Sequence, residues 1–138
     1  LALVEGTVKE SMTIKGYLTK DEKANKVYIC KSDMNGQYIE TKYEPLKYQD
    51  NLTLLKVKLI TGKPHQIRAH LASIGHPIVG DYKYGNKNMN DKYKKQYGIE
   101  SQMLHSWQLV FHAVEGECAN LSDKTFQAQP PKGFDFIL

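Results

Sequence analysis

Arginine is nearly absent from this chain. Of its 19 basic side chains, 18 belong to lysine and one to Arg68. Arginine differs from lysine because its planar, always-charged guanidinium can grip a carboxylate or phosphate through two parallel hydrogen bonds. The single guanidinium lies in residues 59–85, which also hold three of the five histidines. This placement predicts an anionic partner of defined geometry for Arg68.

Cysteine is scarce too, and long apolar runs are missing. Cys30 and Cys118 lie far apart with neither metal-ligand nor redox spacing, so both are expected to be reduced. The chain has no signal-peptide pattern and no apolar run long enough to cross a bilayer. His65 and His70 lack the i, i+4 spacing and the glutamate of a zincin helix, so a metal site is rejected. The glycines form no phosphate-binding loop, and neither cysteine lies in a nucleophile elbow.

The 138 residues fit one domain, and the net charge of +4 permits an anionic partner without requiring one. Lysines concentrate between Gly80 and Gly98, interleaved with tyrosines, a composition suited to phosphates and bases. Taken alone, this cluster is better explained as a solvated surface. Residues 86–100 are expected to be either a helix-bearing insertion or a mobile loop.

The first half of the chain predicts antiparallel strands at 1–8, 13–18, 38–48 and 52–60, and a later strand is expected within 104–114. Turn residues occupy 20–26 and 32–37, with Asn35-Gly36 as a hairpin signal. Residues 125–138 are expected to lie extended over the core. The fold class is therefore α+β, with a mixed, mostly antiparallel sheet and short helices.

One short helix is predicted after Thr61-Gly62. Pro64 suits its first turn, and Gly75 followed by Pro77 ends it after about three turns. Ile67, Leu71 and Ile74 form one apolar stripe. Arg68 lies about 100° around the helix from Ile67, at the edge of this stripe, so its head group can reach a cleft.

Three stretches carry a resemblance to a known family. They are residues 61–71 (TGKPHQIRAHL), residues 74–85 (IGHPIVGDYKYG) and residues 102–111 (QMLHSWQLVF). Together with the first six residues (LALVEG), they resemble the RluA-type RNA pseudouridine synthases, in collinear order over nearly the whole chain. The resemblance implies that the chain is the C-terminal portion, 1–138, of one catalytic domain of that fold.

The resemblance implies an isomerase that turns uridine of RNA, expected to be ribosomal RNA, into pseudouridine in the cytoplasm, without metal or cofactor. An aspartate of an Arg-Leu-Asp motif breaks the N1–C1′ bond of a flipped uridine, which rejoins through C5. Arg68 would hold that carboxylate and lower its pKa, while Ile67 and Leu71 would line the wall against the base. Candidates for RNA contact are Lys63, His65, Gln66, Lys83, Lys92, Lys94 and Lys95.

The sequence departs from the family pattern in three ways. It holds no Arg-Leu-Asp motif, its active-site tyrosine would precede Leu1, and Lys63 and Pro64 replace the usual arginine and threonine. We therefore expect a fragment that is inactive alone, with Arg68 facing an empty site, water or a borrowed counter-ion. Exposed strand edges would favour self-association. The alternative from another class is a non-catalytic RNA-binding module or degenerate relative.

Overall fold

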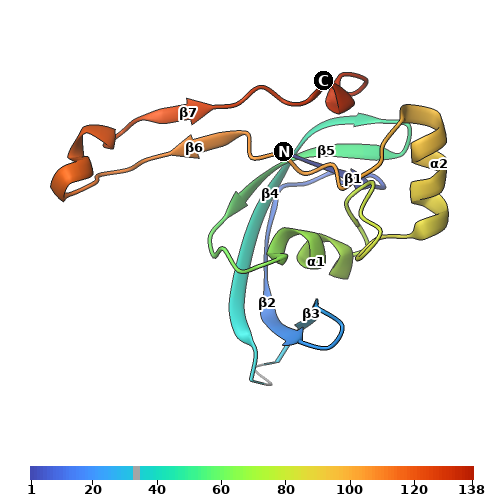
Figure 1. The fold of residues 1–138 in the computed structure, drawn as a ribbon, viewed down its shortest axis with the longest axis horizontal. Helices are drawn as coiled ribbons and strands as arrows, with labels where there is room; N and C mark the ends of the chain where they lie inside the picture. Colours follow the sequence, from blue (N-terminus) through green and yellow to red (C-terminus); the bar gives the residue numbers. More distant parts are fainter. Residues whose placement is uncertain (33–34) are drawn as a thin grey trace.

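A five-stranded antiparallel sheet forms the body of the molecule in the computed structural model, which describes residues 1–32 and 35–138 (Figure 1). Its strands are β1 (Ala2–Glu5), β2 (Met12–Asp21), β3 (Lys26–Cys30), β4 (Gln37–Gln49) and β5 (Leu52–Leu59). They lie in the order β1-β5-β4-β2-β3. Every pairing among these strands is antiparallel, which agrees with the α+β fold expected from the sequence.

Two hairpins set this strand order. β2 turns into β3 at Asp21, whose side chain accepts hydrogen bonds from the amides of Lys23 and Ala24. β4 turns into β5 through Asp50 and Asn51, which both have positive φ, as a tight hairpin turn requires. Asn35-Gly36 does not join paired strands, because β2 lies between β3 and β4. The hairpin expected there is therefore wrong, and part of that connection, residues 33–34, lies outside the described residues.

The main core forms where β1 and the first half of β5 meet the elements around them. Leu3, Val4 and Leu55 are buried, and so are Leu52 and Leu54. Both faces are covered there, so the strands are apolar in runs and do not alternate. The pairing between β1 and β5 stops at Ala2 and Leu55, whereas β5 continues to Leu59. Beyond this point β5 becomes exposed, and Leu59 is 48% accessible.

Helix α1 (Gln66–Ser73) packs on one face of the sheet, against β3 and β4. It begins two residues later than expected and spans only eight residues, because His65 adopts the left-handed conformation (φ 57°) immediately before it. The predicted apolar stripe is only partly correct. Leu71 is fully buried, but Ile67 is half-buried and Ile74 is exposed. Two polar residues of this helix, Gln66 and His70, are buried in their place.

Residues 86–100 contain a helix, so the first of the two expectations for this segment is correct. Helix α2 (Lys87–Tyr97) begins at Asn86, whose side chain accepts a hydrogen bond from the amide of Met89. It ends at Gly98, which adopts the left-handed conformation that favours glycine at this position. Asn90 and Tyr93 bury one side of the helix, and the lysines lie on the other.

A two-stranded arm projects from the body (Figure 1). It consists of β6 (Gln108–Val110), the 3-10 turn η1 (Gly116–Leu121) and β7 (Thr125–Gln127), and all residues of both strands are exposed. The strand expected within 104–114 is thus shorter, and Leu104 forms only an isolated bridge to Ala2. The final residues return through η2 (Lys132–Phe134) and bury Phe134 and Ile137 in the core. The tail is therefore anchored at its end and is not extended over the core throughout.

Candidate functional site

Arg68 is held by a carboxylate of its own chain. Its Nε donates to Oδ2 of Asp81 at 2.7 Å, and its Nη2 donates to Oδ1 at 3.0 Å. The guanidinium also lies over the ring of Tyr84, 5.1 Å from the centroid. The hydrogen bonds to Asp81 raise the pKa of Arg68. Of the three outcomes expected for Arg68, an empty site, water or a borrowed counter-ion, the structure shows the third, because Asp81 of the same chain occupies one side of the guanidinium.

Asp81 is the functional residue that sequence reasoning missed. Its side chain is inaccessible to solvent, and Oδ1 also accepts hydrogen bonds from the amides of Lys83 and Tyr84. Burial would raise the pKa of Asp81, but the hydrogen bonds from Arg68 and these amides outweigh it and lower the pKa. A signal was present. Asp81 belongs to residues 74–85, one of the three stretches that carry the family resemblance. An aspartate shortly before Lys83 and Tyr84 is also typical of a turn in which the aspartate side chain accepts hydrogen bonds from the backbone amides that follow.

A second layer fixes the turn that carries Asp81. Asn90 of α2 is fully buried, accepts a hydrogen bond from the amide of Gly80 at 2.8 Å and donates one to the carbonyl of Asp81 at 3.0 Å. Gly80 has φ +81°, and a Cβ there would lie 2.1 Å from the carbonyl oxygen of Ser101. Helix α2 therefore positions the turn, the turn positions Asp81, and Asp81 positions Arg68.

A pocket of about 300 Å³ opens beside Arg68. We call it the Arg68 pocket, and it is lined by Leu59, Gly62, Lys63, His65, Gln66, Ile67, Arg68 and Leu104. Leu59, Ile67 and Leu104 supply an apolar wall, while Lys63 and Arg68 supply positive charge. Because Nε and Nη2 hold Asp81, the guanidinium still has further N–H donors for a second anion. This combination suits a flat apolar group attached to an anionic chain.

His65 lies at the entrance to α1 and lines the same pocket. Its Nδ1 is 2.8 Å from the hydroxyl of Tyr84, and the two rings meet edge to face. Burial, together with the charges of Arg68 and Lys83, lowers the pKa of His65. The imidazole is therefore neutral at neutral pH and acts there as a hydrogen-bonding group, not as a cation.

Gln66 has a different place from the one expected. It is only 2% accessible, and its Nε2 donates to the carbonyl of Glu40 and the hydroxyl of Thr41. Its Oε1 accepts from the hydroxyl of Thr61 and the amide of Lys63. The side-chain amide is thus engaged in holding residues 61–65 against β4, which leaves it no free group for RNA.

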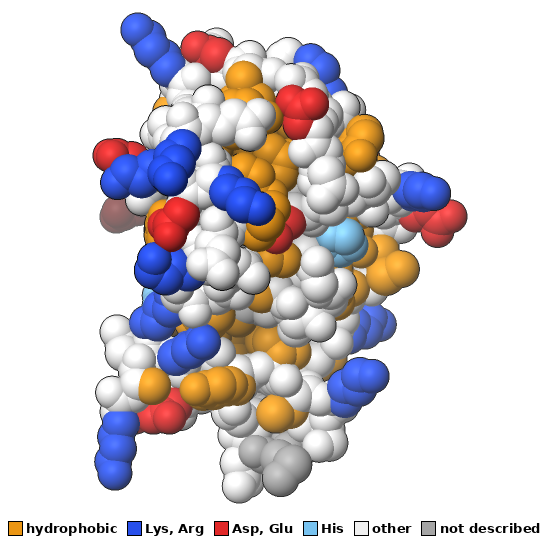
Figure 2. Space-filling view, turned by 90° about the vertical axis from the view of Figure 1, so that its right-hand side faces the viewer, with side chains coloured by type: hydrophobic (Ala, Val, Ile, Leu, Met, Phe, Trp, Pro, Cys, Tyr) orange, Lys and Arg blue, Asp and Glu red, His pale blue; other side chains and the backbone are white. Residues whose placement is uncertain are grey.

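The other predicted site residues are dispersed. Leu71 lies in the core and does not line the Arg68 pocket, and the ammonium of Lys83 contacts the carbonyl of Asn25. Three further lysines lie exposed on α2, outside the pocket: Lys92, Lys94 and Lys95. Figure 2 looks onto the side of the molecule that bears α2 and shows basic side chains around its margins, with apolar side chains between them.

Across the described residues, no three His, Cys, Asp or Glu side chains are grouped to hold a metal ion. Within the same part of the chain, no helix has the length and apolar character needed to span a membrane. Both cysteines are free thiols, Cys118 exposed and Cys30 half-buried. The Arg68 pocket is thus the site where the described side chains gather the clearest chemistry.

The chain is similar to known proteins over most of its length. The family model described as RNA pseudouridylate synthase matches residues 1–73, which include Arg68 and most of the pocket lining. A ribosomal large subunit pseudouridine synthase C of Haemophilus influenzae is 35% identical over 119 residues, covering 85% of this chain and 37% of that protein. An uncharacterized RNA pseudouridine synthase of Helicobacter pylori strain 26695 is 41% identical over 137 residues, covering 98% and 48%.

The chain thus spans less than half of these two curated relatives. Among solved structures, Human RNA Pseudouridylate Synthase Domain Containing 4 superposes with a TM-score of 0.69 over 97% of this chain and 57% of that one. Its sequence identity is 21%, so this likeness concerns the fold alone. The family model covers more than half of the chain, and the relatives agree with it. This chain belongs to the RNA pseudouridylate synthase family.

Proposed function

We propose that this chain is the arginine-bearing part of a catalytic domain that isomerises uridine to pseudouridine in RNA. The observation that carries the proposal is the geometry of Arg68, a guanidinium held on one side by a buried carboxylate and placed in the lining of a partly apolar pocket. Such a group is oriented before any substrate arrives, which is how binding sites stabilise charge without reorganisation.

In this proposal a flipped uracil packs against Ile67, Leu59 and Leu104, since a base must leave its stack before its glycosidic bond can react. The free donors of Arg68 bind the carboxylate of a catalytic aspartate supplied by a segment outside these 138 residues. The N1–C1′ bond breaks and a C5–C1′ bond forms. The proton lost from C5 is balanced by one gained at N1, so the reaction is an isomerisation without oxidant or cofactor.

Ribosomal RNA in the cytoplasm is the proposed substrate, because one of the relatives is named for the ribosomal large subunit. Lys63 and His65 are the proposed RNA contacts within the pocket. Lys83, Lys92, Lys94 and Lys95 are proposed as longer-range contributors to RNA attraction, since they lie outside the pocket lining.

Tritium release from RNA carrying [5-³H]uridine tests this proposal. The 138-residue chain is expected to release no tritium. A full-length protein in which an Arg-Leu-Asp segment accompanies these residues is expected to release it. Arg68→Lys in the full-length protein should lower the rate at least about 100-fold, because lysine cannot hold Asp81 and a second carboxylate in a planar fork. Release by the 138-residue chain, or an active Arg68→Lys enzyme, would overturn the proposal.

The alternative, a non-catalytic RNA-binding protein, predicts a different result for the same samples. The full-length protein would bind RNA in a salt-dependent manner but release no tritium from any ribosomal RNA substrate.

A further inference from the structure

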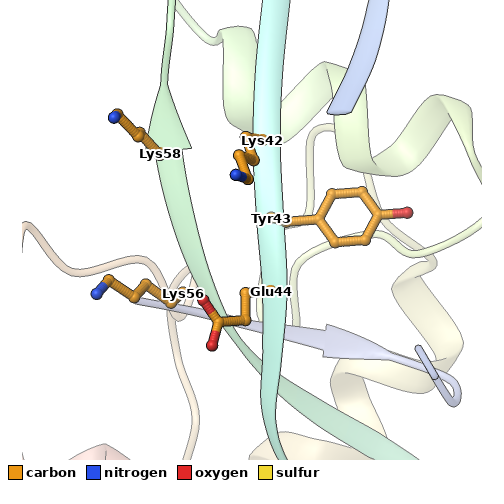
Figure 3. A pocket seen from close by; sticks show the side chains of 5 residues that line it. All are labelled: Lys42, Tyr43, Glu44, Lys56 and Lys58. Atoms are coloured by element: carbon orange, nitrogen blue, oxygen red, sulfur yellow. The ribbon is translucent and has the colours of Figure 1, made fainter. Parts of the chain in front are cut away.

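The face of the sheet that points away from α1 carries an arrangement of side chains that the Arg68 pocket does not use. Strand register places Lys42 of β4 opposite Lys58 of β5, and Glu44 opposite Lys56. Directly paired residues point to the same side of a sheet. Figure 3 shows these four side chains together, with the ring of Tyr43 turned away from them. We call this side the outer face.

A shallow groove of about 170 Å³ lies on the outer face. We call it the lysine groove, and its lining residues are Lys42, Tyr43, Glu44, Lys56 and Lys58. Three lysines and one glutamate thus share the groove. Within residues 1–32 and 35–138, no carboxylate oxygen approaches the three ammonium groups within 4.0 Å. The groove therefore holds three lysines against Glu44 without a close ion pair, and the next carboxylate on the same face, Glu40, accepts a hydrogen bond from the hydroxyl of Tyr38.

Keeping two lysines directly opposite each other costs stability, because like charges on paired strands repel. One of the lysines in the groove is also positioned by an aromatic ring, since Nζ of Lys56 lies 5.6 Å from the centroid of Trp107. A polyanion that binds across Lys42 and Lys58 would offset their repulsion.

Aromatic side chains continue the outer face beyond the groove. Register pairs Tyr38 of β4 with Tyr17 of β2, and their rings meet edge to face at 5.8 Å. Tyr38 is 43% accessible, and Tyr28 on the edge strand β3 is 47% accessible. From Lys42 to Tyr38 is four residues of strand, or about 13 Å. Phosphate-binding lysines and exposed rings at such a spacing are the parts of a surface for single-stranded nucleic acid.

The outer face is separate from the Arg68 pocket. Leu59, which lines that pocket, pairs with Thr41, whose hydroxyl is 2.8 Å from Nδ1 of His70 in α1. Both residues therefore lie on the side of the sheet that α1 covers. A nucleotide in the Arg68 pocket is separated from the lysine groove by the sheet itself, so the two surfaces contact different parts of an RNA.

We infer that the outer face is a second RNA-binding surface that holds single-stranded RNA, with backbone phosphates in the lysine groove and bases on Tyr38 and Tyr28. The nature of the polymer rests on the proposed function, whereas the site itself rests on the register and the charges above. Binding here would fix a single-stranded flank of the substrate while the target uridine occupies the opposite side of the sheet.

Fluorescence anisotropy of the 138-residue chain with a labelled 12-nucleotide oligouridine tests the inference. The triple variant Lys42→Gln/Lys56→Gln/Lys58→Gln is expected to bind at least tenfold more weakly. Its slope of log K against log salt should fall by about 2, since each lost phosphate contact on a single strand contributes about 0.7. Tyr38→Ala should weaken binding about fivefold or more at unchanged slope.

The matched control is Lys9→Gln/Lys23→Gln/Lys132→Gln, which removes the same charge from exposed lysines outside the groove. Its affinity should change less than threefold. An equal loss of RNA affinity in both triple variants would show that only the net charge of the chain matters, and it would overturn the inference. Better competition by an RNA duplex than by oligouridine would overturn the single-strand assignment.

Tritium release by the full-length protein separates the two proposals. If that protein isomerises uridine normally but the groove variant binds RNA like the parent, only the inference about the outer face fails. If the full-length protein has no activity while the groove variant loses RNA binding, the proposed function fails and the second surface stands.

Discussion

The ion pair between Arg68 and Asp81 combines two functions in one residue contact. It satisfies a carboxylate that is inaccessible to solvent, and it fixes the guanidinium in the pocket lining. A buried pair of this kind adds little net stability compared with apolar residues, but losing one partner leaves an uncompensated charge. The contact is therefore better understood as a means of orientation than as a source of stability.

Asp81→Asn is expected to lower the free energy of unfolding by about 2–3 kcal/mol, because the largely buried Arg68 loses its counter-charge. Urea unfolding measures the effect. The matched control is Asp91→Asn, which breaks the exposed pair with Lys87 and should cost less than about 1 kcal/mol. Equal costs for the two variants would contradict the structural role assigned to Asp81.

His70 predicts a dependence of stability on pH. It is 2% accessible, its Nδ1 is 2.8 Å from the hydroxyl of Thr41, and burial lowers its pKa below the usual 6.5. The unfolded chain therefore binds a proton at a pH where the folded chain does not. The contribution of neutral His70 to the free energy of unfolding is complete above about pH 6.5 and is lost as the pH falls through the lowered pKa of the folded chain.

Urea unfolding between pH 7.5 and pH 5 measures this contribution. The parent chain should lose stability toward pH 5, whereas His70→Gln should be less stable throughout and show a flatter dependence. His112→Gln, at an exposed histidine, should keep the slope of the parent chain. A parent slope that persists in His70→Gln would assign the effect to another group.

At the scale of elements, the turn between α1 and α2 is tightly constrained at Gly80. Gly80→Ala should lower the free energy of unfolding by at least about 2–3 kcal/mol, since a Cβ would meet the carbonyl oxygen of Ser101 and φ is +81°. Gly62→Ala is the control, because nothing lies within 4 Å of a Cβ there. Thermal unfolding of the two variants distinguishes a local clash from a general intolerance of alanine.

The elements show where sequence reasoning works and where it stops. The alternation and β-branched content of β2, β4 and β5 predicted these strands. β3 was missed although Val27, Tyr28 and Ile29 favour strands, because this short edge strand lies between two segments assigned as turns, 20–26 and 32–37. Asn35-Gly36 is a good local hairpin signal, but strand order depends on which edge of β2 is free, and no local dipeptide encodes that.

The candidate site likewise has parts that the sequence predicted and parts that it did not. The signature identified Arg68 and its place at the edge of a helix, and that identification needed no coordinates. Neither Asp81 as its partner nor the burial of Gln66 followed from spacing, because both depend on how α2 and β4 approach α1. Local pattern therefore predicts candidate side chains, while packing decides what they contact.

At the scale of the whole molecule, stability is unevenly distributed. Among the described strands, β6 and β7 of the arm pair only with each other, and a lone two-stranded hairpin is marginally stable in water. Hydrogen exchange should therefore label residues 108–127 much faster than the β4–β5 hairpin, which lies within the five-stranded sheet. Mass spectrometry of peptic peptides measures both in one experiment. Equal protection would mean that the arm packs on the body in solution.

β5 extends four residues beyond its pairing with β1. Among the described strands, none pairs with Lys56–Leu59 on the edge of β5 that faces away from β4. An open strand edge invites a second copy of the chain, and two of these four residues are lysines. Two such edges approaching each other would bring like charges together, and salt would screen their repulsion. The ionic strength of the solution, and not only the protein concentration, therefore governs whether this edge of β5 stays unpaired or pairs with a second copy of the chain.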